Sequence, residues 1–492
     1  MVDMPEEQRS GIDNLEAENA RLREEIAELR AEVDRLRNQV AEFKAKLNTS
    51  SQNSSASPSS DSPGKKAEAR KKRSERRREE RTRLKAEVRR RGKQPGAPGK
   101  TLPMRDDPDE VVPHEPSQCR DCGKDLCDAE HEGVERRQVF DTPHPKLICT
   151  EHQGVRRRCA CGTVTTGDFP PEARAPASYG PNVRANALYL LHGQHLSVER
   201  CAEAMSAMLG VTVSTGFVSS LAAEAAGGLV GFMEELRRRL LSSEVIHVDE
   251  TPDQVRTDTW WFHVVASELY TYLFASPTRG KAAPDAAGVL LEYRGVMVHD
   301  RLRMYWNYAS ARHAICGAHL LRDLDGVAAV GTQEPWAAGM RTLLVEMNDA
   351  CHEARAASRS RLSRRKLKGF LDRYDALVKE GLAANPEPAY GGRDYLARKS
   401  YNLVCALRDL RREATRFAKD LRVPFTNNDG ERPLRMAKLH KKISGCFQAD
   451  DHARHFAAIR SYLGTARKHG VGALDVLGLL FQGDCWMPPW TT

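Results

Sequence analysis

Apolar residues recur at two positions of a seven-residue repeat through the first 48 residues of the chain. One position holds Leu15, Leu22, Leu29, Leu36 and Phe43. The other holds Ile12, Asn19, Ile26, Val33, Val40 and Leu47. Leucine at one position and mainly β-branched residues at the other are typical of a parallel two-stranded coiled coil, in which Asn19 would fix the register. Residues 1–48 are therefore predicted to form a leucine zipper that makes the protein a homodimer. The alternative is a single amphipathic helix docked on the rest of the protein.

In the second half of the chain the pattern changes to short apolar runs that predict β-strands. The predicted strands cover residues 244–249, 259–266, 270–275 and 295–300, with a helix at about 282–292 before the fourth. The first run ends on Asp249 and the fourth on Asp300. A further apolar run ends at Gly317, and a helix is expected from about Ala318. This order predicts a ribonuclease-H-like α/β sheet, in which the first and fourth strands are neighbours. Asp249 and Asp300 should then lie side by side.

Helical patterns flank this core, which is predicted over residues 243–330 and 425–492. Residues 176–242 have apolar side chains at helical spacing, typical of a helix–turn–helix that reads DNA or of helices packed beneath a domain. Residues 331–424 are helical and basic, and they predict an all-α insertion between the two parts of the core. Its basic face either lines a DNA channel or is simply solvated.

A third acid stands at the start of a predicted helix. Asn427, Asn428 and Asp429 are candidates for the N-cap, and Pro433 suits a first turn. Glu431 then lies close to the helix start, with Asp429 as a rival for the same role. Downstream residues give this helix a basic face suited to DNA phosphates; they include Arg435, Lys438 and Lys441.

Asp249, Asp300 and Glu431 predict a metal-dependent phosphoryl-transfer site. Mg²⁺ prefers carboxylate oxygens, keeps several waters and binds phosphate oxygens of a substrate as well. Two such ions, Mg²⁺ or Mn²⁺, can activate an attacking oxygen and stabilise a leaving one. Carboxylates placed close together repel one another unless a cation lies between them. The alternative is that the two strand-end aspartates are ordinary loop residues.

The charge of the chain is clustered, which points to nucleic acid as a partner. The net charge is +9, with 76 basic and 67 acidic residues. Residues 49–104 read as a flexible linker followed by a basic arm suited to sequence-independent contact with DNA phosphates. Its densest clusters include Lys71, Lys72, Arg73, Arg76, Arg77 and Arg78. A solvated, disordered charge run is the alternative, and such an arm can order only on binding. Residues 94–101 look like a phosphate-binding loop, but Gln94 stands where that motif requires glycine.

Two cysteine pairs within residues 105–175 predict a small zinc-binding domain. Cys119 and Cys122 form a Cys-x-x-Cys pair followed by glycine, and Cys159 and Cys161 form a Cys-x-Cys pair. Four thiolates on two tight turns are typical of a structural Zn²⁺ site. Cys127 and Cys149 are competing ligands, and the alternative is that the cysteines are small buried hydrophobic residues. Because the chain shows neither a long apolar run nor a signal peptide, we expect reduced thiols and a cytoplasmic location at the bacterial nucleoid, without membrane contact.

Several blocks of the sequence resemble the transposases of the insertion-sequence-66 group. These are residues 249–251, 300–305, 316–319 and 427–432. The resemblance extends to the predicted zipper, the connector after the basic arm and the cysteine pairs. It implies a DDE transposase of the large-subunit type, with a helical insertion in a ribonuclease-H-like fold.

The resemblance also assigns roles. It implies that Asp249, Asp300 and Glu431 bind the metal ions, and that the protein cuts and joins DNA at element ends, commonly with small accessory proteins of the same element. Cys316 and His319 match a Cys-x-x-His block, which we interpret as a structural pair. Two alternatives remain: a DNA-binding protein that has lost catalysis, and a ribonuclease-H-like nuclease that cuts but does not join.

Overall fold

The computed structural model describes residues 102–142, 145–170, 172–173, 175–328, 334–388 and 395–489, together with helical residues between 18 and 36. The described residues fall into two compact units, one ending at Lys146 and the other beginning at Leu147 and including the N-terminal helical residues. The boundary between the units lies inside residues 105–175. The basic arm and residues 94–101 lie outside the described residues.

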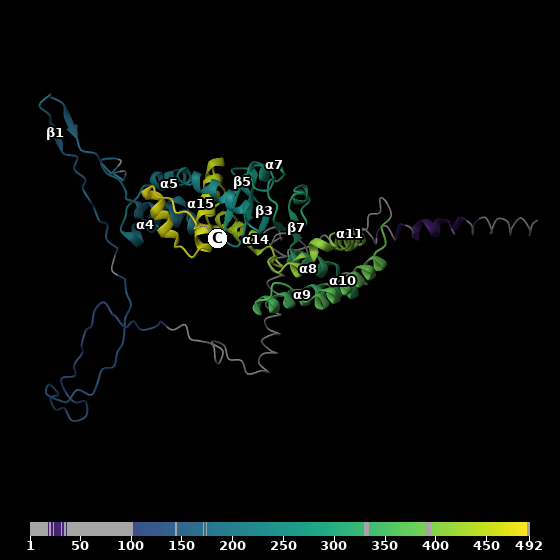
Figure 1. Ribbon diagram of the computed structural model, residues 1–492, viewed down its shortest axis with the longest axis horizontal. Coiled ribbons are helices and arrows are strands. Elements are labelled where there is room, and N and C mark those ends of the chain that lie inside the picture. The colour runs from purple at the N-terminus through teal and green to yellow at the C-terminus, as the bar shows by residue number, and fades with distance from the viewer. Residues whose placement is uncertain are drawn as a thin grey trace, which may run out of the picture. The chain divides into compact units, whose positions relative to one another are not determined.

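A five-stranded mixed sheet forms the centre of the larger unit (Figure 1). Its strands are β3 (Val245–Val255), β4 (Asp258–Ala266), β5 (Thr271–Ser276), β6 (Val296–His299) and β7 (Arg312–Ile315), in the order β5-β4-β3-β6-β7. The first three strands form an antiparallel meander, and β6 and β7 run parallel to β3. The predicted adjacency of the first and fourth strands is therefore confirmed.

Two expectations about this sheet were wrong in detail. Asp249 was expected at a strand end, but β3 continues to Val255 because β4 pairs with it from His247 to Val255. The helix expected at about residues 282–292 is the short α7 (Ala282–Ala286). It ends early because Gly288 adopts a left-handed backbone conformation with φ of +73°. A 3-10 turn, η3 (Arg303–Asn307), connects β6 to β7.

Helices cover both faces of the sheet, because successive strand residues point to opposite faces. On β6, Met297 belongs to a core cluster with the helices that precede the sheet. Its neighbours Val296 and Val298 belong to a second cluster with the helices that follow β7. A smaller third cluster joins β4 to the C-terminal helices, as the contact of Phe262 with Phe456 shows.

The helices before the sheet are α3 (Pro181–Leu188), the π-helix η2 (Tyr189–Gly193), α4 (Val198–Leu209), α5 (Thr215–Gly228) and α6 (Val230–Leu241). Ser197 and Ser214 cap α4 and α5, since each side chain accepts a backbone N–H of its helix. Their apolar faces pack into the cluster beneath the sheet, which agrees with the packing interpretation of this region. Among the described helices, none alone is long and apolar enough to cross a bilayer; α5 and α6 reach that length only as a pair bent by 52°.

After β7 the chain forms α8 (Gly317–Ala328) and the predicted helical region. That region contains α9 (Glu334–Ala356), α10 (Arg364–Ala384), α11 (Tyr395–Asp409), α12 (Arg411–Ala414) and α13 (Arg416–Lys419). In Figure 1 the helices α8 to α11 lie together beyond β7. They share one core with the last two strands, so this region is packed directly on the sheet edge.

Three helices complete the chain: α14 (Asn428–Ser444), α15 (Asp450–Lys468) and α16 (Ala473–Gln482). Pro433 was expected in the first turn of α14 but lies in its second, because the helix begins at Asn428. The proline ring has no N–H to donate to the carbonyl four residues earlier. Asn427 occupies the N-cap position, but its side chain makes no cap hydrogen bond and reaches the sheet instead.

Candidate active site

Strand register brings the two predicted aspartates opposite each other. In the parallel pair, Val245, Ile246 and His247 of β3 face Val296, Met297 and Val298 of β6. Continuing that register by two residues sets Asp249 against Asp300, which follows β6 directly. Asp249 thus lies where its parallel neighbour ends, although β3 itself continues.

Glu431 comes to the same end of the sheet through the start of α14. The side chain of Asn427 donates from Nδ2 to the Val248 carbonyl oxygen at 2.8 Å, and its Oδ1 lies 2.9 Å from His247 Nδ1. Both bonds are buried, and together they attach the start of the helix to β3 one residue before Asp249. The first turn of α14 therefore presents Glu431 towards the aspartates.

The charges of Asp300 and Glu431 both act on Asp249. The pKa of Asp249 is raised well above its ordinary value, first by burial and then by the charges of Glu250, Asp300 and Glu431. Burial and the charge of Glu250 raise the pKa of Asp300 to about 6. Asp429 lies beside His247 instead, with its Oδ2 3.9 Å from Nε2. Glu431 is the acid of α14 whose charge acts on Asp249.

Glu250 is a fourth acid of this environment that sequence reasoning overlooked. Its side chain is 3% exposed and accepts the Tyr305 hydroxyl at 2.7 Å on Oε2. Arg279 donates to its other oxygen, Oε1, at 2.8 and 3.1 Å. Position 250 directly follows Asp249 and was visible in the sequence. Arg279 and Tyr305 lie 29 and 55 residues away, and no local pattern connects them to it.

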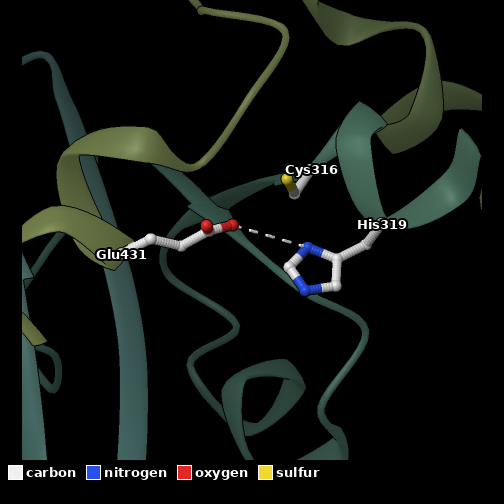
Figure 2. A group of neighbouring side chains, drawn as sticks. All are labelled: Cys316, His319 and Glu431. Carbon is white, nitrogen blue, oxygen red and sulfur yellow. Dashed lines mark ion pairs between the residues drawn. The ribbon is translucent and has the colours of Figure 1, made fainter. Parts of the chain in front are cut away.

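Cys316 and His319 lie beside Glu431, a proximity that the sequence did not show. One ligand atom from each of these three side chains lies within 4.8 Å of the other two. His319 Nδ1 is 4.0 Å from Glu431 Oε1, and Figure 2 shows the three side chains pointing towards one another. Cys316 Sγ accepts the backbone N–H of Asn427 at 3.2 Å. The Cys-x-x-His block thus faces the start of α14.

Basic side chains of α8 and α14 lie close to Glu431. Arg435 Nη2 lies 3.5 Å from Glu431 Oε2, and Arg322 Nη2 lies 3.9 Å from Oε1. Lys438 is half-buried, and burial lowers its pKa while the charges of Asp249 and Glu431 oppose that shift. Lys441 is exposed further along the helix.

A basic cavity of about 310 Å³ lies between the loop after Asp300 and α11. It is lined by Arg301, Asp323, Arg398, Lys399, Asn402 and Leu403. The side chains of Arg301 and Asp323 form an ion pair at its wall. Sequence reasoning identified the basic character of the helical region but not these residues, because the cavity forms only when α11 packs beside α8.

The two predicted zinc-binding pairs each occupy a tight turn. Cys119 accepts the Gly123 N–H on its backbone oxygen, and the backbone N–H of Cys122 lowers the pKa of the Cys119 thiol. Cys159 and Cys161 lie in the turn that joins β1 (Arg156–Arg158) to β2 (Val164–Thr166). A hydrogen bond with the Thr163 hydroxyl lowers the pKa of Cys161 to about 7.

Low thiol pKa values favour metal binding, because the thiolate is the ligand. Each pair lies on a tight turn, and the competing ligands Cys127 and Cys149 are exposed. The pairs belong to different compact units, and a joint four-cysteine site stays a prediction.

One known protein family matches more than half of this chain. Residues 176–455, more than half of its length, match the Transposase IS66 family. The chain belongs to the IS66 transposase family. The matched region contains Asp249, Asp300 and Glu431, and also the Cys316–His319 pair. The family resemblance predicted from the sequence blocks is confirmed.

Two further matches concern other parts of the chain. Residues 2–91 match a family of unknown function, DUF6444. A relative, the uncharacterized protein y4qI of Sinorhizobium fredii (strain NBRC 101917 / NGR234), is 25% identical over 377 residues. That alignment covers 69% of this chain and 64% of the relative, so the chain spans slightly less than two thirds of the relative's length.

Proposed function

We propose that this IS66-family protein is a DDE transposase that cuts and joins DNA at the ends of an insertion element. The observation that carries the proposal is the meeting of Asp249, Asp300 and Glu431 at one end of the sheet, where Glu431 and Asp300 both raise the pKa of Asp249. The strand order β5-β4-β3-β6-β7 supports a ribonuclease-H-like core.

The residues fit divalent metal ions. Buried carboxylates that repel one another call for a cation, and their oxygens are the ligands that Mg²⁺ and Mn²⁺ prefer. Asp249, Asp300 and Glu431 would hold two ions. When bound, these ions supply activation of the attacking oxygen and stabilisation of the leaving oxygen.

The protein's own groups position the DNA for this reaction. A water oxygen attacks a phosphodiester at the element end, and the 3′ oxygen leaves as a hydroxyl. That hydroxyl then attacks a phosphodiester of the target, whose own 3′ oxygen leaves as a hydroxyl. Arg435 and Lys438, beside the acids, are suited to the phosphate charge. The cavity that includes Arg398 and Lys399 is suited to phosphates of the same strand.

The test is Mg²⁺-dependent nicking of DNA that carries the element ends. Asp249→Ala should lower the nicking rate by at least about a thousandfold while DNA affinity stays unchanged. Arg398→Glu should instead weaken DNA binding and flatten its salt dependence by about one phosphate contact. Equal nicking by Asp249→Ala and the wild type would rule out the proposed role of Asp249.

The same assay separates the alternatives. A protein that binds the ends without metal-dependent nicking is a DNA-binding protein that has lost catalysis. One that nicks but does not join pre-cleaved ends to a target is a nuclease. Strand transfer from pre-cleaved ends, lost in Asp249→Ala, is the result expected of a transposase.

A further inference from the structure

Cys316, His319 and Glu431 form a cluster whose ligand atoms come from three places in the sequence. Cys316 follows β7, His319 lies in the first turn of α8, and Glu431 lies near the start of α14. Cys316 is fully buried and His319 is 8% exposed. Their ligand atoms converge with a Glu431 oxygen within 4.8 Å (Figure 2).

The imidazole of His319 has an unsatisfied nitrogen that faces this cluster. Nδ1 is inaccessible to solvent and has no hydrogen-bond partner within the part of the chain that the structure describes. At 4.0 Å, Glu431 Oε1 is too far to accept a hydrogen bond from it. A buried polar atom without a partner costs free energy, and a bound cation would satisfy the nitrogen and the carboxylate together.

We propose that Cys316 Sγ, His319 Nδ1 and Glu431 Oε1 bind one zinc-class divalent ion. A thiolate and an imidazole select Zn²⁺ over Mg²⁺, which takes oxygen ligands. Zinc ligands lie about 2.0–2.3 Å from the ion, so tetrahedral neighbours are roughly 3.3–3.8 Å apart. Since the ligand atoms now lie up to 4.8 Å apart, they would need to approach one another by up to about 1.5 Å. On binding, the thiol releases its proton to solvent and no electron is transferred.

This ion would orient the glutamate that we propose as catalytic, and in that respect the inference rests on the proposed function. The carboxylate has two oxygens: Oε1 faces His319, while Oε2 faces Arg435 at 3.5 Å. Ligation through Oε1 would join the start of α14 to the start of α8 and leave Oε2 for the site of Asp249. The ion would replace the contact of Arg322 with Oε1, which is 3.9 Å long.

The experiment measures zinc bound by the purified full-length protein after dialysis, together with the spectrum of its cobalt-substituted form. Cys316→Ser and His319→Gln should each bind one zinc fewer than the wild type. The cobalt form of Cys316→Ser should also lose part of the thiolate-to-cobalt absorption. The predicted cysteine pairs serve as an internal reference, because Cys119→Ser should remove a different zinc and leave this one bound.

Two control variants separate this site from general damage and from catalysis. Cys351→Ser removes another fully buried thiol and should keep the full zinc content. Asp249→Ala should also keep it while nicking is lost. If Cys316→Ser does not fold, His319→Gln gives the same reading, judged by its thermal unfolding. Unchanged zinc content in folded His319→Gln would overturn the proposal. If His319→Gln loses zinc but Asp249→Ala still nicks DNA, the zinc site stands and only the proposed catalytic role of Asp249 is overturned.

Discussion

Asp300 links the proposed metal site to the stability of the fold. Its pKa is about 6 in the folded protein, above the ordinary value of 3.8, because burial and Glu250 disfavour its charge. Between about pH 4 and 6 the folded state therefore binds more protons than the unfolded state. The free energy of unfolding falls as pH rises through that window and stays lower above it.

Asp300→Asn should remove this penalty. At pH 7, without divalent ions, the variant should be more stable than the wild type by on the order of 2 kcal/mol, and at pH 4 the difference should vanish. Urea unfolding measured between pH 4 and 7.5 checks this. Asp253 is the matched control, since burial raises its pKa to about 6 as well. Asp300→Asn and Asp253→Asn should both gain stability, but only Asp300→Asn should lose stabilisation by Mg²⁺. A stability difference between Asp300→Asn and the wild type that does not change with pH would contradict the raised pKa of Asp300.

Tyr305 holds Glu250 next to the aspartates. Its hydroxyl donates to Glu250 at 2.7 Å, in a fully buried position. Tyr305→Phe should lower the free energy of unfolding by about 1.5–3 kcal/mol, as expected for a hydrogen bond to a charged group, and nicking by about tenfold. Tyr308→Phe is the control, because it loses a similar bond to Asp285 at 2.9 Å. Equal effects of the two variants on nicking would show that Glu250 has no part in the site.

At the residue scale the sequence predicted the acids better than their surroundings. Asp249 and Asp300 were recognisable because each closes an apolar run, and Glu431 because it follows a run of capping residues. The partners Arg279 and Tyr305 depend on how loops fold back over the sheet. The same holds for the meeting of His319 with Glu431, which joins helices more than 100 positions apart.

At the scale of elements, short apolar runs predicted all five strands of the central sheet, and the order of the elements predicted the adjacency of β3 and β6. The boundaries were less predictable. The α7 helix stops before Gly288, whose left-handed conformation ends it, and α14 begins early enough to place Pro433 inside it. Asn427, one of three N-cap candidates, occupies that position, but its side chain donates to β3 instead of accepting an N–H of α14.

Asn427 therefore sets the position of α14 on the sheet. Asn427→Ala would leave the Val248 carbonyl and the His247 ring without these partners in a fully buried place. The free energy of unfolding should fall by about 2–4 kcal/mol, and nicking should fall because Glu431 loses its support. Asn385→Ala is the control: Asn385 is also buried, and its side chain donates to the Gly381 carbonyl oxygen of its own helix at 2.8 Å. Chemical denaturation and nicking of both variants separate loss of stability from loss of position.

At the scale of the whole molecule, the N-terminal helix is the feature whose partner the sequence predicts. Along the described part of that helix, the seam residues are between 45% and 59% exposed. They are Leu22, Ile26, Leu29, Val33 and Leu36. A continuous apolar stripe in water favours a second helix that covers it. A homodimer would also bring two proposed active sites to two element ends at once.

Leu29→Asp in the full-length chain tests this. A carboxylate in the seam of a coiled coil would be buried without a partner, so dimer affinity should fall by at least about a hundredfold. Ala27→Asp adds the same charge two residues earlier, outside the heptad seam, and should leave the dimer intact. Sedimentation at micromolar concentration distinguishes the two. The monomeric variant should still nick a single end but should fail to join two ends in one complex. A wild-type protein that sediments as a monomer would instead favour a lone amphipathic helix, and pairing of the ends would then require a different surface.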